Sequence, residues 1–192
     1  MRPVPLTAAL ILPLALAACD KGGPTVSATN ASTAEVQEKV AAASGGGDAL
    51  MVEPGRWEGT MTMHDIQLAG MDKMPPAARA QMISQMGKAK TIISCVTPEE
   101  VKAKNGFFKG LDDKSCKYDH FTLAGGKLDA AMSCAHDGGA KVSMTMNGSY
   151  SPQAYHMDIA SRTSGNSPMG MSMKMTMDAK RVGACRGTPD ES

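Results

Sequence analysis

The amino-acid sequence predicts a mainly β protein: a single antiparallel curved sheet or an open barrel, with one or two short helices and two disulfides. Three observations lead to this prediction. Several segments after residue 51 alternate apolar and polar residues with a period of two, which is typical of half-buried strands. Glycine pairs lie between such segments, as they do in antiparallel hairpins. Four cysteines in the same region form an even set.

Residues 1–18 are predicted to be a signal peptide. Arg2 is the only charge before an apolar run from Leu6 to Ala18, which is shorter than the roughly 20 residues of a transmembrane helix. Small residues then lead directly into Cys19. We therefore expect a lipoprotein whose lipidated Cys19 holds it on the inner or outer membrane, at the periplasmic side of a bacterial envelope. The alternative is an ordinary cleaved signal peptide in which Cys19 is incidental.

Residues 19–50 are predicted to be the lipidated cysteine and a flexible tether. The stretch 22–33 is rich in Gly, Ser, Thr, Asn and Ala and has no apolar period. Residues 34–43 predict at most a transient helix, which a Ser-Gly-Gly-Gly run at 44–47 ends. Such a tether would hold a folded domain clear of the lipid headgroups.

The folded domain is expected over residues 51–186, followed by a polar tail over 187–192. Its first strand is predicted from Arg56 to Leu68, with Trp57 and the nearby methionines on one face. Two prolines at 75–76 predict a helix through Met86, and residues 90–96 predict the second strand.

Thr97, Pro98 and Glu100 together predict the start of a further short helix. Thr97 is suited to be the N-cap, Pro98 occupies the first helical position, and Glu100 completes a capping box. An Asn-Gly pair at 105–106 is expected to end this helix.

The hairpin from Cys116 to Cys134 predicts the first disulfide. A Gly-Gly pair at 125–126 marks its turn. In a register with a three-residue loop, where Leu123 lies opposite Lys127, the two cysteines fall directly opposite each other. Facing residues of this kind lie near disulfide distance.

Cys95 and Cys185 are then left to form the second bridge, by elimination. Outside the cytoplasm four such cysteines favour disulfides. A zinc site is the competing interpretation, but the chain has no Cys-x-x-Cys pair.

Three further strands are predicted after a turn at 137–139. They cover residues 142–150, 155–159 and 169–177. The apolar residues occupy the even-numbered positions in the first of these strands and the odd-numbered positions in the other two. A Ser-Pro-Gln turn at 151–153 separates the first two strands.

Several short segments together resemble an uncharacterised family of small exported bacterial proteins, domain of unknown function 3617 (DUF3617). The resemblance covers about residues 51–186 and implies an exported, mostly β domain, often lipidated, with paired cysteines and no assigned activity. It supplies no catalytic residue. The segments are Pro54 to Glu58, Cys95 to Glu99, Cys116, Cys134, Gly148 to Tyr150, and Gly183 to Cys185.

The methionines are the candidate functional residues. The chain has 17 of them against one Trp, three Tyr and three Phe. On one interpretation they line a cavity for an apolar ligand or protein partner. Alternatively, they bind Cu(I) through soft thioethers, or they simply fill the core. The candidates are Met61, Met63, Met144, Met146, Met169, Met171, Met173, Met175 and Met177.

Other classes of function have little support in the sequence. The formal net charge is +1, with scattered Lys and Arg, so we expect no nucleic-acid partner. No nucleophile elbow, zinc-protease motif or phosphate-binding glycine loop is present. We therefore expect a non-enzymatic protein without a resident cofactor, copper being the exception to test. Its expected partners are the membrane, through Cys19, and an apolar molecule or envelope protein.

Overall fold

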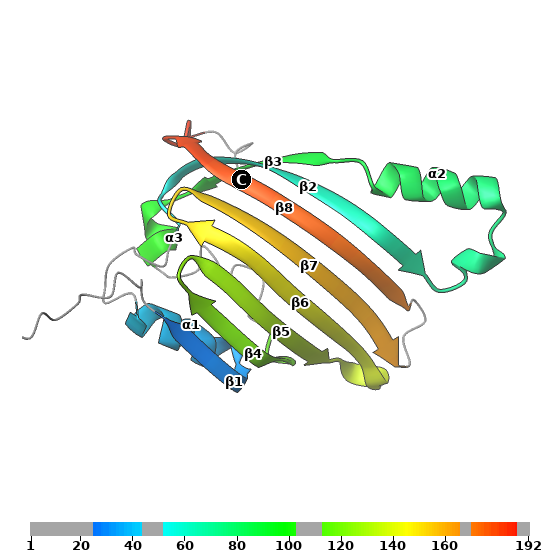
Figure 1. The fold of residues 1–192 in the computed structure, drawn as a ribbon, viewed down its shortest axis with the longest axis horizontal. Helices are drawn as coiled ribbons and strands as arrows, with labels where there is room; N and C mark the ends of the chain where they lie inside the picture. Colours follow the sequence, from blue (N-terminus) through cyan, green and yellow to red (C-terminus); the bar gives the residue numbers. More distant parts are fainter. Residues whose placement is uncertain (1–24, 44–51, 103–112, 166–169, 188–192) are drawn as a thin grey trace, which may run out of the picture.

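The computed structural model describes residues 25–43, 52–102, 113–165 and 170–187. These residues form one eight-stranded antiparallel sheet that remains open, in the order β1-β4-β5-β6-β7-β8-β2-β3 (Figure 1). The strands are β1 (Val26–Ser32), β2 (Gly55–Leu68), β3 (Lys90–Val96), β4 (Cys116–Ala124), β5 (Lys127–Ala135), β6 (Ala140–Ser151), β7 (Ala154–Gly165) and β8 (Met171–Gly183). The helices are α1 (Thr33–Ala43), α2 (Pro76–Met86) and α3 (Pro98–Lys102), with short 3-10 turns η1 (Met71–Lys73) and η2 (Asp137–Gly139).

The predicted mainly β fold is confirmed, and most of the predicted strands begin and end within a few residues of the observed ones. β7 and β8 are the exceptions, because they continue to Gly165 and Gly183 instead of ending near Ile159 and Met177. The capping box of α3 also forms. The Thr97 backbone N–H donates to Glu100 Oε2 at 2.9 Å, and the Glu100 N–H donates to Thr97 Oγ1 at 3.1 Å.

The flexible tether predicted for residues 20–50 is wrong where the structure describes it. Residues 26–43 form β1, which pairs with β4 at the edge of the sheet, and α1, which packs on the same two strands. Ser32 caps α1, because its Oγ accepts the Glu35 N–H at 3.2 Å. The small apolar residues of this segment give a weak sequence pattern, yet Val36 and Val40 are only 0% and 2% exposed. Partners elsewhere in the sheet supply the burial that the local pattern does not predict.

The β4–β5 hairpin has a different register from the predicted one near its turn. The glycines at 125 and 126 have φ values of 56° and 73° and form a two-residue turn, so that Ala124 pairs with Lys127. A bulge at Asp119 then shifts the register by one residue. The shift places Cys116 opposite Cys134 as predicted, although for a different reason.

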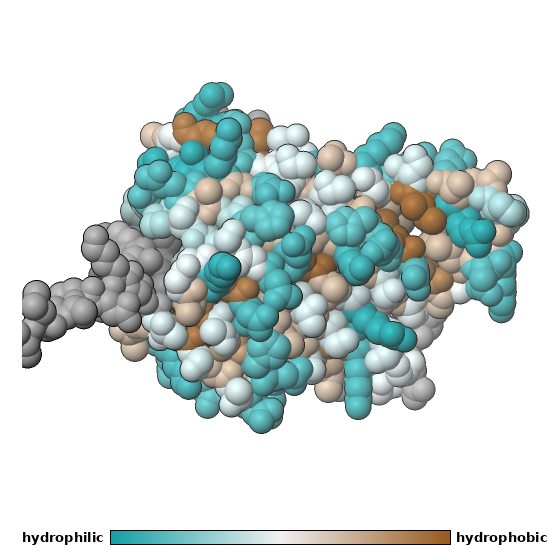
Figure 2. Space-filling view, in the orientation of Figure 1, coloured by the Kyte–Doolittle hydropathy of each residue, from teal (hydrophilic) through white to brown (hydrophobic). Residues whose placement is uncertain are grey.

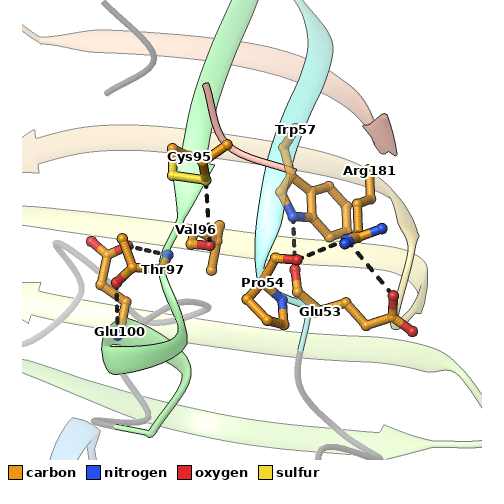
Figure 3. The surroundings of a disulfide bond; sticks show 9 residues. Glu53, Pro54, Trp57, Cys95, Val96, Thr97, Glu100 and Arg181 are labelled. Atoms are coloured by element: carbon orange, nitrogen blue, oxygen red, sulfur yellow. Dashed lines mark hydrogen bonds and ion pairs between the residues drawn. A yellow bond between two sulfur atoms is a disulfide. The ribbon is translucent and has the colours of Figure 1, made fainter. Parts of the chain in front are cut away.

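Both predicted disulfides form in the structure. Cys116 bonds to Cys134 inside the hairpin, with a sequence separation of 18. Cys95 bonds to Cys185 across a sequence separation of 90, and so joins β3 to the segment that follows β8 (Figure 3).

The helix α2 forms as predicted but adds little to the core. It has no buried residue, and its Ile83 is 39% exposed. The helix lies beyond the edge of the sheet near β2 and β3 (Figure 1).

Candidate ligand-binding groove

The sheet has one apolar and one polar face. Antiparallel pairing keeps residues of one parity on one side, so the alternating strands align their apolar residues in rows. Figure 2 shows the side on which hydrophilic residues cover most of the sheet. The helix α1 packs on the opposite, apolar side, where the main hydrophobic core lies.

Cross-strand pairing gathers the predicted methionines on the apolar face. Met177 of β8 lies between Met157 of β7 and Met61 of β2. In the next row, Met175 lies between Ile159 and Met63. The pairing of β2 with β8 therefore joins their Met-x-Met segments into one continuous patch of thioethers.

The apolar face divides into two halves. In the covered half, formed by β1, β4 and β5 under α1, Tyr118 and Phe121 are each only 1% exposed. In the open half, formed by β6, β7, β8 and β2, most of the methionines are half-buried. They are Met61, Met63, Met144, Met171, Met173, Met175 and Met177.

The open half contains a groove of about 370 Å³. None of its thirteen described lining residues is charged, and six of them are methionines. The lining residues are Val52, Trp57, Ser94, Val96, Met144, Met146, Tyr155, Met157, Ile159, Ser161, Met173, Met175 and Met177.

Trp57 and Tyr155 form one end of this groove. Their rings stack with centroids 5.8 Å apart and planes 27° apart. The Tyr155 hydroxyl donates to Met177 Sδ at 3.4 Å. Burial raises the pKa of Tyr155, so this hydroxyl keeps its proton at neutral pH.

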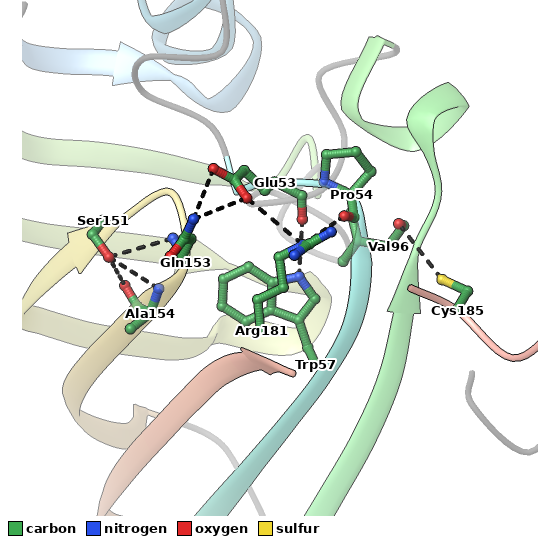
Figure 4. Close-up of polar contacts among 9 residues, drawn as sticks. All are labelled: Glu53, Pro54, Trp57, Val96, Ser151, Gln153, Ala154, Arg181 and Cys185. Atoms are coloured by element: carbon green, nitrogen blue, oxygen red, sulfur yellow. Dashed lines mark hydrogen bonds and ion pairs between the residues drawn. The ribbon is translucent and has the colours of Figure 1, made fainter. Parts of the chain in front are cut away.

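A polar cluster holds Trp57 in place, and its Arg181 is the cross-strand partner of Trp57. The Trp57 indole N–H donates to the Glu53 carbonyl at 3.0 Å, and Arg181 Nε donates to the Pro54 carbonyl at 2.8 Å (Figures 3 and 4). Arg181 also lies 3.7 Å from the Glu53 carboxylate, to which the Gln153 amide donates (Figure 4). The groove end is thus tied to β8, to the β6–β7 turn and, through the nearby disulfide, to β3.

The structure places five of the nine predicted methionines in the groove wall. Met61 and Met63 lie on the same face beside it, and Met171 lines a separate hollow at the far end of β8. Met169 lies outside the described residues. The prediction missed Met157, Trp57, Tyr155 and Ile159, although their strand parity was the signal that could have found them.

The histidines lie away from the methionines, on the polar face. His156 Nδ1 is 2.7 Å from Asp178 Oδ1, and its Nε2 is 3.3 Å from Asp158 Oδ2. These hydrogen bonds, that to Asp178 first, raise the pKa of His156. Within the described ranges, no group of three or more His, Cys, Asp or Glu side chains is arranged to hold a metal ion.

The polar face also carries a hollow of about 610 Å³. Ser149, His156 and Asp178 line it and stand in one cross-strand row. Both ring nitrogens of His156 face carboxylates, so the imidazole is held for ion pairing and is poorly placed to take a proton from a serine hydroxyl.

Among the described residues, no helix has both the length and the apolar character needed to cross a membrane. No curated protein and no solved structure matches this chain. A family profile described as a protein of unknown function, DUF3617, matches residues 52–185. The match covers more than half of the chain, which therefore belongs to the DUF3617 family of proteins of unknown function.

Proposed function

We propose that this protein is a non-enzymatic binding module for an uncharged apolar molecule, held at the bacterial envelope by a lipidated Cys19. The observation that carries the proposal is the methionine-lined groove on the open half of the sheet. A half-buried apolar surface of this kind is typical of a binding site.

The chemistry of the wall supports an uncharged ligand. A charged group placed in the groove would lose hydration and find no opposite charge among the lining residues. The few polar groups there, Ser94, Ser161 and the Tyr155 hydroxyl, suit at most a single hydroxyl or carbonyl on the ligand. Methionine side chains have three rotatable bonds and adapt to ligands of different shape.

The proposed anchor supports the same ligand class. Apolar molecules are concentrated in membranes, and a lipid on Cys19 would keep the groove near that source. Residues 1–24 lie outside the described ranges, so the anchor rests on the sequence. Intact-mass analysis of the protein extracted from membranes tests it: a diacylglycerol adduct on Cys19 is expected, and an unmodified mature N-terminus would contradict it.

Trp57 provides a direct binding assay, because it is the only tryptophan of the chain and lies in the groove wall. We expect 1-dodecanol to change its fluorescence in a saturable way. Ser161→Phe fills the groove from β7, where Ser161 lies between Met144 and Met173. This variant is expected to bind dodecanol about tenfold more weakly, which corresponds to about 1.4 kcal/mol.

Ala160→Phe is the matched control for that variant. It makes a comparable change one residue away, on the polar face of the same strand. It should bind dodecanol as the unchanged protein does. Equal losses in the two variants would contradict the groove as the site, and so would the absence of saturable binding in the unchanged protein. In the latter case a protein partner becomes the occupant to test.

Copper is the alternative function, and the pairing of Met177 with Met157 and Met61 favours it. Thioethers suit Cu(I), although the histidines face the other way. Titration with Cu(I) against a competing chelator tests this alternative. Binding that is lost in Met177→Leu would support it, and binding no tighter than millimolar would remove it.

A further inference from the structure

We infer that the open half is an oxidation-sensitive site, in which peroxide-class oxidants convert the half-buried groove methionines to sulfoxides and so weaken the binding of apolar molecules. The modification site stands on its own geometry. The loss of binding rests on the proposed function.

The methionines differ in their access to solvent in a way that predicts an order of reaction. Met173, Met175 and Met177 of β8 are half-buried, so solvent reaches part of each side chain. Met132, Met146 and Met157 are only 3%, 5% and 7% exposed. Because oxidation follows exposure, the β8 methionines should react first.

The distribution of methionine along the sheet supports a role beyond filling space. The covered half buries mainly Tyr, Phe, Leu, Val and Ala, with Met132 as its only buried methionine among the described residues of β1, β4, β5 and α1. The open half has methionine at most inward positions of β8. Isoleucine or valine would fill such strand positions equally well and with a better β preference. Oxidisable side chains are therefore concentrated where solvent reaches the apolar face.

The proposed reaction is a two-electron oxidation of one thioether. A lone pair of Met Sδ attacks one oxygen of hydrogen peroxide, a new S–O bond forms and the O–O bond breaks. After proton transfer the products are one methionine sulfoxide and one water. The peroxide is the oxidant and is consumed.

The product would change the groove at a defined place. Met177 Sδ accepts a hydrogen bond from the Tyr155 hydroxyl, and the Tyr155 ring stacks on Trp57. A sulfoxide there adds a polar oxygen to a wall whose described residues carry no charge, beside the aromatic end of the groove. An apolar ligand would then have to displace the water that hydrates this oxygen.

The experiment treats the full-length protein with dilute hydrogen peroxide and follows two readouts. Peptide mass mapping over time measures sulfoxide at each methionine. Dodecanol titration, read from Trp57 fluorescence, measures binding before and after treatment. We expect sulfoxide at Met173, Met175 and Met177 before Met132, Met146 and Met157, and an affinity about tenfold lower after treatment.

Two variants separate the groove methionines from the others. In the triple variant Met173→Leu, Met175→Leu and Met177→Leu, the ratio of affinities before and after peroxide should fall towards one. Met82→Leu replaces a half-buried methionine on α2, outside the groove, and should keep the full drop in affinity.

Several outcomes would overturn the inference. If Met132 were oxidised as fast as Met175, the predicted order of oxidation, and with it the modification site, would be contradicted. Unchanged dodecanol affinity in fully oxidised protein would remove the regulation. If untreated protein binds no dodecanol, the proposed function fails, while the mass mapping still tests the modification site separately.

Discussion

The covered and open halves of the apolar face are built from the same alternating pattern, but their inward side chains differ in how far they are buried. In the covered half, α1 lies over β1 and β4, and the residues beneath it are almost fully buried. In the open half, methionine is the commonest inward residue, and most of these methionines keep part of their surface in solvent. A period-two pattern thus identifies the inward face of a strand, but the element that covers this face decides whether it becomes core or binding surface.

The cover comes from outside the region that the family profile matches. The match begins at residue 52, after both β1 and α1. Residues 26–43 therefore complete the sheet and its core, and the region 52–185 alone would expose the apolar residues of β4.

Removal of the disulfides is expected to give the largest effects on stability. The chain-entropy estimate for the Cys95–Cys185 loop, with a separation of 90, is about 4.5 kcal/mol. For Cys116–Cys134, with a separation of 18, it is about 3 kcal/mol. Urea unfolding of the two double Cys→Ala variants measures both. A larger loss for the second pair would show that packing in the covered half outweighs loop length.

Truncating the same residue type in each half tests the comparison more sharply. Met132→Ala, in the covered half, should cost about 2–5 kcal/mol of unfolding free energy, because it leaves a cavity in a packed core. Met175→Ala, in the open half, should cost about 1 kcal/mol, since part of this side chain is already hydrated. Equal costs would contradict the division into two halves.

Loss of the α1 cap should have a smaller effect, confined to the covered half. Ser32→Ala removes the hydroxyl that accepts the first-turn N–H, at a cost of about 1 kcal/mol. Hydrogen exchange should become faster in α1 and β1 and stay unchanged in β7 and β8. Faster exchange over the whole sheet would mean that α1 supports the open half as well.

The smallest expected effect is a pH dependence on the polar face. The pKa of His156 is raised from 6.5 by Asp178 and Asp158, so the protonated ring stabilises the folded state. This contribution is complete below pH 6.5 and is lost as the pH rises through the raised pKa. The difference in thermal midpoint between the unchanged protein and His156→Asn should therefore shrink above that pH, whereas a constant difference would contradict the ion pair.

The sequence was sufficient for the strands, the disulfide pairing and the family resemblance, since these depend on alternation, turn glycines and short motifs. It was insufficient for β1 and α1, because their small residues become buried only through contact with β4, which the local sequence does not show. The bulge at Asp119 has no local signal either. It shifts the register by one residue, which offsets the difference between the predicted three-residue loop and the observed two-residue turn. The groove depends on the order of the strands, which brings β2 beside β8, and on Trp57 and Tyr155 meeting from different strands.

Methionine methyl NMR tests the central claim most directly. In protein labelled with ¹³C at the methionine methyl groups, titration with 1-dodecanol should shift the signals of Met144, Met173, Met175 and Met177. The signal of Met132, under α1, should stay in place. Uniform shifts, or shifts confined to α2 and the polar face, would contradict the claim that the open half of the sheet is the ligand site.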